Sequence, residues 1–420
     1  MLNAFSGIFN IPDLRKKFLF TLSMIAVFRF GAHVPISGID PAKLQSIFGR
    51  GGLLGFLDLF TGGALARFSI FGLGIIPYIN ASIIMQLLVV VIPQLEQLSK
   101  EGGEGRKKIA QYTRYFAVTL AAVQATGTAF WLRGMLKPGY NFPFFLASCV
   151  IALTAGTCLI MWLGELITEK GIGNGASLII FVGIVSRIPS YIGNTITLVR
   201  GGGSLIGVSV LVAVFLAMIV FIVIVQEAQR RVQVQYAKRV VGRKVYGGQS
   251  TYIPLRINQG GVLPIIFASS VLFFPATIAQ FIPVGFLKSI AAAITPGNLA
   301  YVVLFFCLIF FFTYFYTAIT FNPVDLADNI KRYGGFVMGI RPGKPTAEYL
   351  EYVITRLTLV GALFLALVAI IPSIVEGLTH ITTFKGLGAT ALLIIVGVAL
   401  DLVRQIETHL VARQYEGLIT

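Results

Sequence analysis

The chain has 420 residues, of which 56% are hydrophobic, and its mean hydropathy is +0.85. Soluble domains are far less apolar, so these values exclude a soluble globular protein and predict one that crosses a bilayer several times. The formal net charge is +16, and most of the lysines and arginines lie between the apolar runs rather than within them.

Apolar stretches of about the length that crosses a bilayer as a helix, roughly 20 residues, recur along the chain. The sequence predicts ten such spans, near residues 18–36, 73–92, 112–133, 143–164, 176–196, 204–226, 262–284, 299–321, 354–375 and 387–405. Because ten is even, both termini are expected on one side. Most lysines and arginines lie on that side, so the positive-inside rule places both termini in the cytosol.

One stretch, residues 53–91, is too long and too interrupted by glycine to be a single membrane helix. Its second part, 73–91, is about one span long, whereas 53–69 is short, amphipathic and contains Gly62, Gly63 and Arg67. Interrupted backbone is tolerated at membrane depth only where protein or a water-filled cavity surrounds it. The sequence therefore predicts a cavity with residues 53–69 folded into it.

Two cytosolic loops, near 227–261 and 322–352, are long and basic. Alternation of apolar and polar residues in the first predicts a hairpin around Gly242 or Gly247-Gly248. The second is expected to lack helices and to contain a turn, GIRPGKP, that exposes Arg341. Loops of this length usually bind a partner, although they could also serve only to fix topology.

The spans lack the residues that catalysis or ion coupling would need. Glu165, Glu227 and Asp401 lie at or near span ends, and no Ser/His/Asp or HExxH pattern or phosphate-binding loop is present. The three cysteines show no metal spacing. We therefore expect no enzyme activity, no cofactor and no metal. A secondary transporter for a small solute and a membrane scaffold without a pore remain as alternatives.

Several motifs resemble the SecY family, the pore subunits of the bacterial and plastid protein translocase. The resemblance covers nearly the whole chain and is carried by LGIIPYINASIIMQLL (73–88), EGGEGRKKIAQYTRY (101–115), ITEKGIGNGASLIIF (167–181), QRRVQVQYAKR (229–239), GGVLPIIFASS (260–270) and GIRPGKPTAEYLE (339–351).

The resemblance implies an all-α membrane protein with ten transmembrane helices in two pseudo-symmetric halves, residues 1–200 and 201–420. The halves would surround an hourglass pore whose waist is a ring of apolar side chains. The ring positions match Ile75, Ile79, Ala176, Ile180, Ile266 and Ile394. Relatives usually carry isoleucine where Ala176 stands, and we expect a neighbour such as Ile179 to fill that gap. An apolar constriction suits the role, because it excludes water and ions and offers no fixed partner to a passing chain.

The resemblance also implies a plug, in the form of a short helix, over about 53–69, with the residues Leu53, Leu57, Asp58, Phe60, Leu65 and Arg67. Signal sequences would leave sideways through a lateral gate between spans two and three and spans seven and eight. Polar residues that could hold this seam are Asn80, Ser82, Gln86, Gln124 and Ser269.

For partners, the resemblance implies SecE-type and SecG-type small membrane subunits, the SecA motor ATPase, the ribosome, signal-bearing polypeptides and membrane lipids. The two basic loops would dock the ribosome or the motor, with Arg243, Lys244 and Arg341 as the expected contacts. The implied location is the bacterial plasma membrane, with the thylakoid as the alternative.

Overall fold

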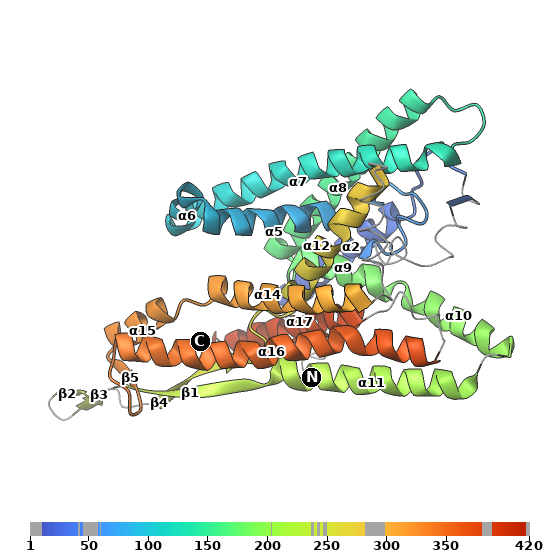
Figure 1. Cartoon of the computed structure of the whole chain (residues 1–420). Coiled ribbons are helices and arrows are strands. Elements are labelled where there is room, and N and C mark those ends of the chain that lie inside the picture. The colour runs from blue at the N-terminus through green and yellow to red at the C-terminus, as the bar shows by residue number, and fades with distance from the viewer. Residues whose placement is uncertain are drawn as a thin grey trace.

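The computed structural model describes residues 11–40, 43–44, 58, 60–202, 204–236, 239–241, 244–246, 250–281, 299–379 and 389–416. These residues are mostly helical (Figure 1). The α-helices are α2 (Pro12–Gly31), α5 (Ile76–Val91), α6 (Pro93–Lys100), α7 (Gly103–Trp131), α8 (Phe142–Lys170), α9 (Gly175–Val185), α10 (Ile188–Arg200), α11 (Leu205–Glu227), α12 (Leu263–Phe281), α14 (Leu299–Thr320), α15 (Pro323–Arg332), α16 (Lys344–Thr379) and α17 (Ala389–Glu416).

A helix overlaps each of the ten predicted spans. By length and hydropathy, six helical stretches of the described residues could cross a membrane, or seven if the bent pair α5 and α6, which meet at 99°, counts as one. The fifth predicted span divides at Arg187 into α9 and α10. Pro189 lies in the first turn of α10, where its missing N–H is tolerated, so the residue favours a helix start rather than a continuous helix.

The two long loops fold together as one small unit. Strand β1 (Gln229–Tyr236) lies between β4 (Ser250–Arg256) and β5 (Gly335–Val337), antiparallel to both, with Val234 opposite Thr251 and Val337. The two alternating pieces of the predicted hairpin therefore pair with each other, as β1 and β4. A second pair, β2 (Arg239–Val241) and β3 (Lys244–Tyr246), is also antiparallel, and the positions expected for the turn, Gly242 and Gly247-Gly248, lie outside the described residues. Val232 and Leu255 pack with Leu350 of α16 in a shared apolar cluster.

The expectation that the second loop lacks helices is wrong. It contains α15 and the first turns of α16. The signal for α15 is local: the Asn322 side chain accepts hydrogen bonds from the N–H groups of Val324 and Asp325, and Pro323 occupies the first turn. Lys331 and Arg332 in the last turn complement the helix dipole.

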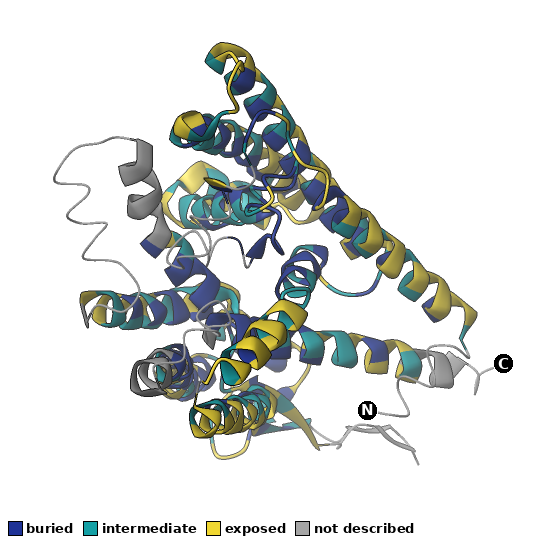
Figure 2. Cartoon of the chain, turned by 90° about the vertical axis from the view of Figure 1, so that its right-hand side faces the viewer, coloured by how far each residue is buried: buried dark blue, intermediate teal, exposed yellow. Residues whose placement is uncertain are grey.

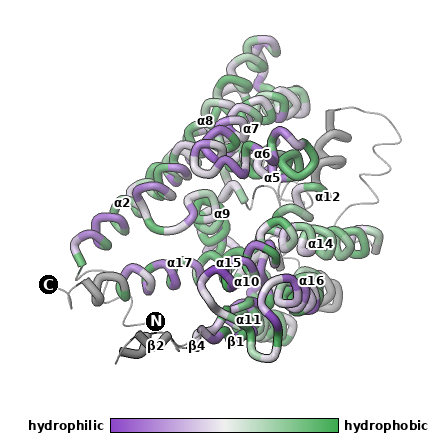
Figure 3. The backbone as a smooth tube through the Cα atoms, turned by 90° about the vertical axis from the view of Figure 1, so that its left-hand side faces the viewer, coloured by the Kyte–Doolittle hydropathy of each residue, from purple (hydrophilic) through white to green (hydrophobic). Residues whose placement is uncertain are grey.

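Most of the helices share one apolar core, which runs from Phe28 on α2 to Leu400 on α17. Buried residues lie where helices face one another, and exposed ones lie on the outer faces, as on α11 (Figure 2). Hydrophilic residues gather on α6 and α15 at one end, while α14 is largely hydrophobic (Figure 3). We call this end, where the β-strands, α6 and α15 lie, the sheet end.

Candidate functional site: a cavity with an apolar floor

A cavity of about 500 Å³ lies among α5, α7, α8, α9 and α12. Five of the six predicted ring residues line it: Ile75, Ile79, Ala176, Ile180 and Ile266. The sixth, Ile394, is buried in the same core, with 1% of its surface exposed, but does not line the cavity. The structure therefore places five residues that the resemblance assigns to the ring around one cavity, although they come from three separate parts of the chain.

Helical spacing explains how these residues reach one surface. Ile75 precedes α5, and Ile79, Ser82 and Gln86 follow at intervals of three or four residues, so all four face the cavity. On α9, Ala176 and Ile180 are four residues apart and are related in the same way.

Helix α12 contributes Leu263, Ile266 and Phe267 at the same helical spacing. The ring of Phe267 packs edge-on against Phe312 of α14, with the two ring centroids 5.8 Å apart. Leu263 and Phe267 line the cavity but were not among the predicted ring residues. The i, i+3, i+4 pattern around Ile266 was the available signal.

The mouth of the cavity is polar. The Arg114 side chain forms an ion pair with Glu165, with Nε and Oε1 2.7 Å apart, and links α7 to α8. Thr168, Glu169 and Asn174 also line this part, and the Asn174 side chain caps α9 by accepting a hydrogen bond from the Ser177 N–H at 3.2 Å. The cavity thus changes from charged at its mouth to aliphatic at its floor.

Ala176 lines the cavity, whereas Ile179, the neighbour expected to fill its place in the ring, is not among the lining residues. Ile179 is buried, with 1% exposed, and its side chain lies against Gly164 of α8. The cause is the close approach of α8 and α9, since a Cβ on Gly175 would lie 1.9 Å from the carbonyl oxygen of Gly164. Helices this close direct Ile179 toward α8 and leave Ala176 facing the cavity.

The turn segment, residues 58 and 60–74, lies on the far side of the floor, and Ile75, which follows it, is part of the floor. Ala176 and Ile180 of α9 line the cavity, whereas Gly183 and Ser186, further along the same chain, contact the turn segment. At 1.5 Å per residue, Ile180 therefore lies between the cavity and the segment. From Thr61 to Ile75 the chain makes successive turns, so the expected plug helix does not extend over these residues.

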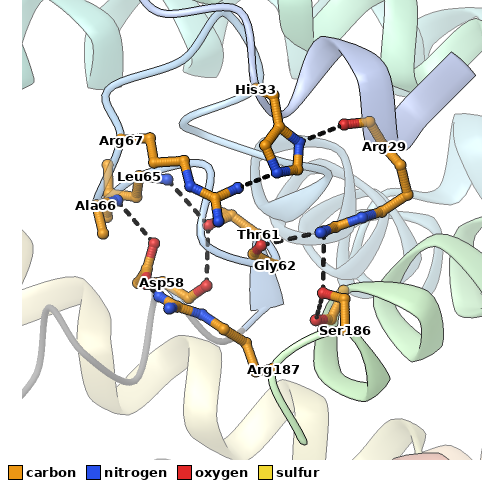
Figure 4. A network of polar contacts seen from close by, with 11 residues as sticks. Arg29, His33, Asp58, Thr61, Gly62, Leu65, Ala66, Arg67, Ser186 and Arg187 are labelled. Carbon is orange, nitrogen blue, oxygen red and sulfur yellow. Dashed lines mark hydrogen bonds and ion pairs between the residues drawn. The ribbon is translucent and has the colours of Figure 1, made fainter. Parts of the chain in front are cut away.

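Polar contacts fix the turn segment (Figure 4). Asp58 is 1% exposed and forms an ion pair with Arg187, and its Oδ1 accepts a hydrogen bond from the Ala66 N–H at 2.7 Å. Arg29, in the last turn of α2, donates to the Gly62 carbonyl at 3.2 Å and to the Ser186 hydroxyl at 2.9 Å. Of the other predicted plug residues, Phe60 and Leu65 are buried, Arg67 contacts the His33 ring, and Leu53 and Leu57 lie outside the described residues.

The predicted gate residues form no hydrogen bond to one another across the seam within the described structure. Helix α12 contacts both α5 and α7. Ser269 donates to the Ile266 carbonyl of its own helix, and the Gln86 amide reaches the Ser82 hydroxyl of its own helix at 3.5 Å. Gln124 is half-buried, and Asn80 has a buried side-chain oxygen without a hydrogen-bond partner.

Of the predicted docking residues, Arg341 is exposed in the loop before α16, at the sheet end. Its carbonyl accepts a hydrogen bond from the Thr346 hydroxyl at 2.8 Å, which anchors the loop to the helix. Lys244 lies in β3, and its side chain is outside the described residues, as is the whole of Arg243.

A membrane protein with this helical bundle, whose central cavity has an apolar floor backed by a folded segment, has the architecture of a channel subunit. The sequence model of the family described as SecY matches residues 69–403. The chain is 48% identical to protein translocase subunit SecY of Streptomyces galbus, with all of both chains covered. It is 45% identical to that of Thermotoga maritima, with 100% of this chain and 98% of the relative covered. The chain belongs to the SecY family.

Solved structures agree with this fold. A protein-conducting channel superposes with a TM-score of 0.69 at 18% identity and covers 94% of this chain and 92% of its own. Sec61 from the canine ribosome–channel complex of the endoplasmic reticulum gives 0.65 at 17% identity, covering 94% and 92%.

Proposed function

We propose that this chain is the pore-forming subunit of a protein translocase. It passes unfolded, signal-bearing polypeptides across the membrane and releases hydrophobic segments sideways into the bilayer. The observation that carries the proposal is the cavity floor, where Ile75, Ile79, Ala176, Ile180 and Ile266 meet from three helices. A floor of small aliphatic side chains excludes water and ions at rest and presents no fixed hydrogen-bonding group to a passing polypeptide.

The proposal includes the finer architecture. Ten transmembrane helices form two halves, 1–200 and 201–420, and both termini face the cytosol. The sheet end is then cytosolic, the cavity opens toward the cytosol, and the turn segment is the plug on the opposite side. The basic character of the loops at the sheet end supports this orientation.

The proposed partners follow from the same assignment. SecE-type and SecG-type subunits would bind within the membrane, and lipids would surround the outer apolar faces. The ribosome or the SecA motor would bind the sheet end, where Arg341 is exposed. The similarity to a ribosome-bound Sec61 channel supports the ribosome as one of these partners. The motor or the ribosome would also supply the energy for translocation, as the resemblance to the SecY family implies.

The alternative of a small-solute transporter is disfavoured by the cavity. Its charged lining residues, Arg114, Glu165 and Glu169, lie at the mouth, and its floor offers no ligand for a coupling ion.

The proposal is tested in proteoliposomes that contain the chain with its small subunits and receive the motor, ATP and a signal-bearing precursor. We expect the precursor to become protected from added protease, and a precursor without its signal sequence to stay accessible. If a precursor of proven competence stays accessible although the complex has assembled, the proposed function is wrong.

A further inference from the structure

The turn segment carries one deeply buried carboxylate that the channel function leaves unexplained. The Asp58 side chain is 2% exposed and pairs with Arg187, whose side chain is 27% exposed. Removing a carboxylate from water is costly unless a paired charge and further hydrogen bonds compensate it. Here Arg187 supplies the charge and the Ala66 N–H supplies a hydrogen bond at 2.7 Å.

The contacts join the turn segment to two separate helices. Arg29 projects from the last turn of α2 and donates to the Gly62 carbonyl. Arg187 lies between α9 and α10 and is the N-cap residue, immediately before the first residue of α10. Figure 4 shows both guanidinium groups directed at the segment, which lies between them.

Glycines at the contact surfaces permit this close approach. Gly62 has φ +66°, and a Cβ there would lie 3.0 Å from Arg29 Nη1 and 3.0 Å from the Cα of Gly183. A Cβ on Gly183 would lie 2.8 Å from the carbonyl oxygen of Phe60. The backbone of the segment therefore rests directly on α9, within reach of both arginines.

We propose that Asp58, Arg187 and Arg29 form a charge latch that holds the plug closed and releases it when α10 moves. The inference rests on the proposed role of the turn segment as the plug. A buried ion pair adds little stability over apolar packing, but losing one partner is strongly unfavourable because it strands the other charge. Such a contact is close to all-or-none, whereas apolar contacts weaken gradually as surfaces separate.

The position of Arg187 provides the trigger. From Arg187 the chain continues through α10 directly to α11, the first helix of the proposed second half. A displacement of α10 that accompanies separation of the halves would withdraw Arg187 from Asp58. Plug release would then follow opening of the pore rather than precede it.

The latch predicts a graded order of leaks. Arg187→Gln strands the buried carboxylate and should raise resting ion conductance most, by roughly tenfold or more. Asp58→Asn strands the guanidinium of Arg187, which is partly solvated, and should raise conductance less. Arg29→Gln removes hydrogen bonds to neutral oxygens only and should have the smallest effect of the three.

The deciding comparison is a double-mutant cycle in planar bilayers, using the complex assembled with its small subunits. We expect the double variant Asp58→Asn, Arg187→Gln to leak less than Arg187→Gln alone, because neither charge is stranded. Arg200→Gln, at an exposed position on the same α10, is the matched control and should conduct like the wild type. If the effects of the two single changes simply multiply in the double variant, the pair is not coupled and the latch is wrong.

A second measurement distinguishes loss of the latch from poor assembly of a variant. A cysteine at Leu65, which is 9% exposed, should react slowly with a membrane-impermeant maleimide in the wild type and faster in Arg187→Gln. Equal labelling rates per assembled channel would overturn the latch.

Deletion of residues 53–67 separates failure of the latch from failure of the plug. A leak after deletion, together with wild-type conductance and labelling in Arg187→Gln, would refute the latch and leave the plug in place. A deletion without leak would refute the plug itself, and the latch with it.

Discussion

The two sides of the cavity floor face each other across one layer of isoleucines, yet they are built from opposite chemistry. On the cavity side, Ile75, Ile79 and Ile180 present aliphatic surface. On the other side, Asp58, Arg29 and Arg187 join the turn segment to its surroundings through charges and hydrogen bonds.

The difference separates two functions of a closed channel. Apolar contacts are non-directional, so an aliphatic floor can re-form around any polypeptide and still exclude ions. Ion pairs and hydrogen bonds require defined geometry, so we expect the turn segment to hold one specific position when the proposed channel is closed. Variants that act on only one side should therefore produce different defects.

The largest expected effect comes from placing a polar group in the floor. Ile180→Asn changes a residue that is 2% exposed and should hydrate the constriction, at a cost of about 2–4 kcal/mol to the closed state. We expect a raised resting conductance and better transport of precursors with defective signal sequences. Ile196→Asn, on α10 where the side chain is 48% exposed, is the control and should change neither measurement.

A second variant, Ile394→Asn, tests whether Ile394 belongs to the constriction. Ile394 is 1% exposed but does not line the cavity, so a polar group there should lower stability more than it raises conductance. A leak equal to that of Ile180→Asn, measured per assembled channel, would place Ile394 in the constriction.

A smaller effect is expected where the two sides touch. A methyl group on Gly183 would lie 2.8 Å from the Phe60 carbonyl oxygen, which cannot move without shifting the turn segment. Gly183→Ala should raise resting conductance roughly threefold while leaving the floor intact, since even small shifts in a packed contact are felt. The control is Gly193→Ala on α10, where no atom lies within 4 Å and alanine should favour the helix by about 0.5–1 kcal/mol. Unchanged conductance in Gly183→Ala would mean that the segment does not rest on α9 as a seal.

The contrast can also be tested by strengthening the floor. Ala176 lines the cavity, so Ala176→Ile extends the aliphatic surface into open space. We expect resting conductance to fall about twofold and translocation to slow, because more apolar area must separate when the pore opens. Ala213→Ile, at an exposed position on α11, provides the same change of side chain outside the cavity. Faster translocation in Ala176→Ile would show that the alanine is not a gap in the floor.

The helices could be predicted from the sequence for a physical reason, because apolar runs of membrane length are local signals, and each predicted span overlaps a helix. The floor residues were instead expected from the resemblance to the SecY family, and only Ile75 and Ile79 also had a local signal, their i, i+4 spacing. The fifth span was nevertheless predicted as continuous, although Pro189 marks the break beside Arg187.

The polar network could not be predicted, because its members are distant in the chain. Arg29 and Ser186, for instance, are 157 residues apart in sequence, and nothing local indicates their 2.9 Å hydrogen bond. The same limit applies to Ile179, whose direction depends on how closely α8 and α9 approach each other. By contrast, α15 was missed despite a local signal, the cap residue Asn322 followed by a proline.

The smallest effect on the closed channel is expected at the sheet end, away from both sides of the floor. Arg341 is exposed in the loop before α16, so Arg341→Glu should leave folding and resting conductance unchanged. It should weaken ribosome binding, because a guanidinium that can contact phosphate is replaced by a carboxylate, which the negative phosphate repels. Losing one phosphate contact should also flatten the salt dependence of binding by about one unit of slope.

Co-sedimentation of ribosomes with the solubilised complex across a salt series measures both the affinity and its salt dependence. The matched charge reversal is Lys137→Glu, at an exposed position outside the two basic loops. If Arg341→Glu and the double variant with Arg243→Glu both bind like the wild type, the basic loops serve only to fix topology. If Arg341→Glu raises resting conductance instead, the sheet end is coupled to the floor, and the separation between binding and sealing does not hold.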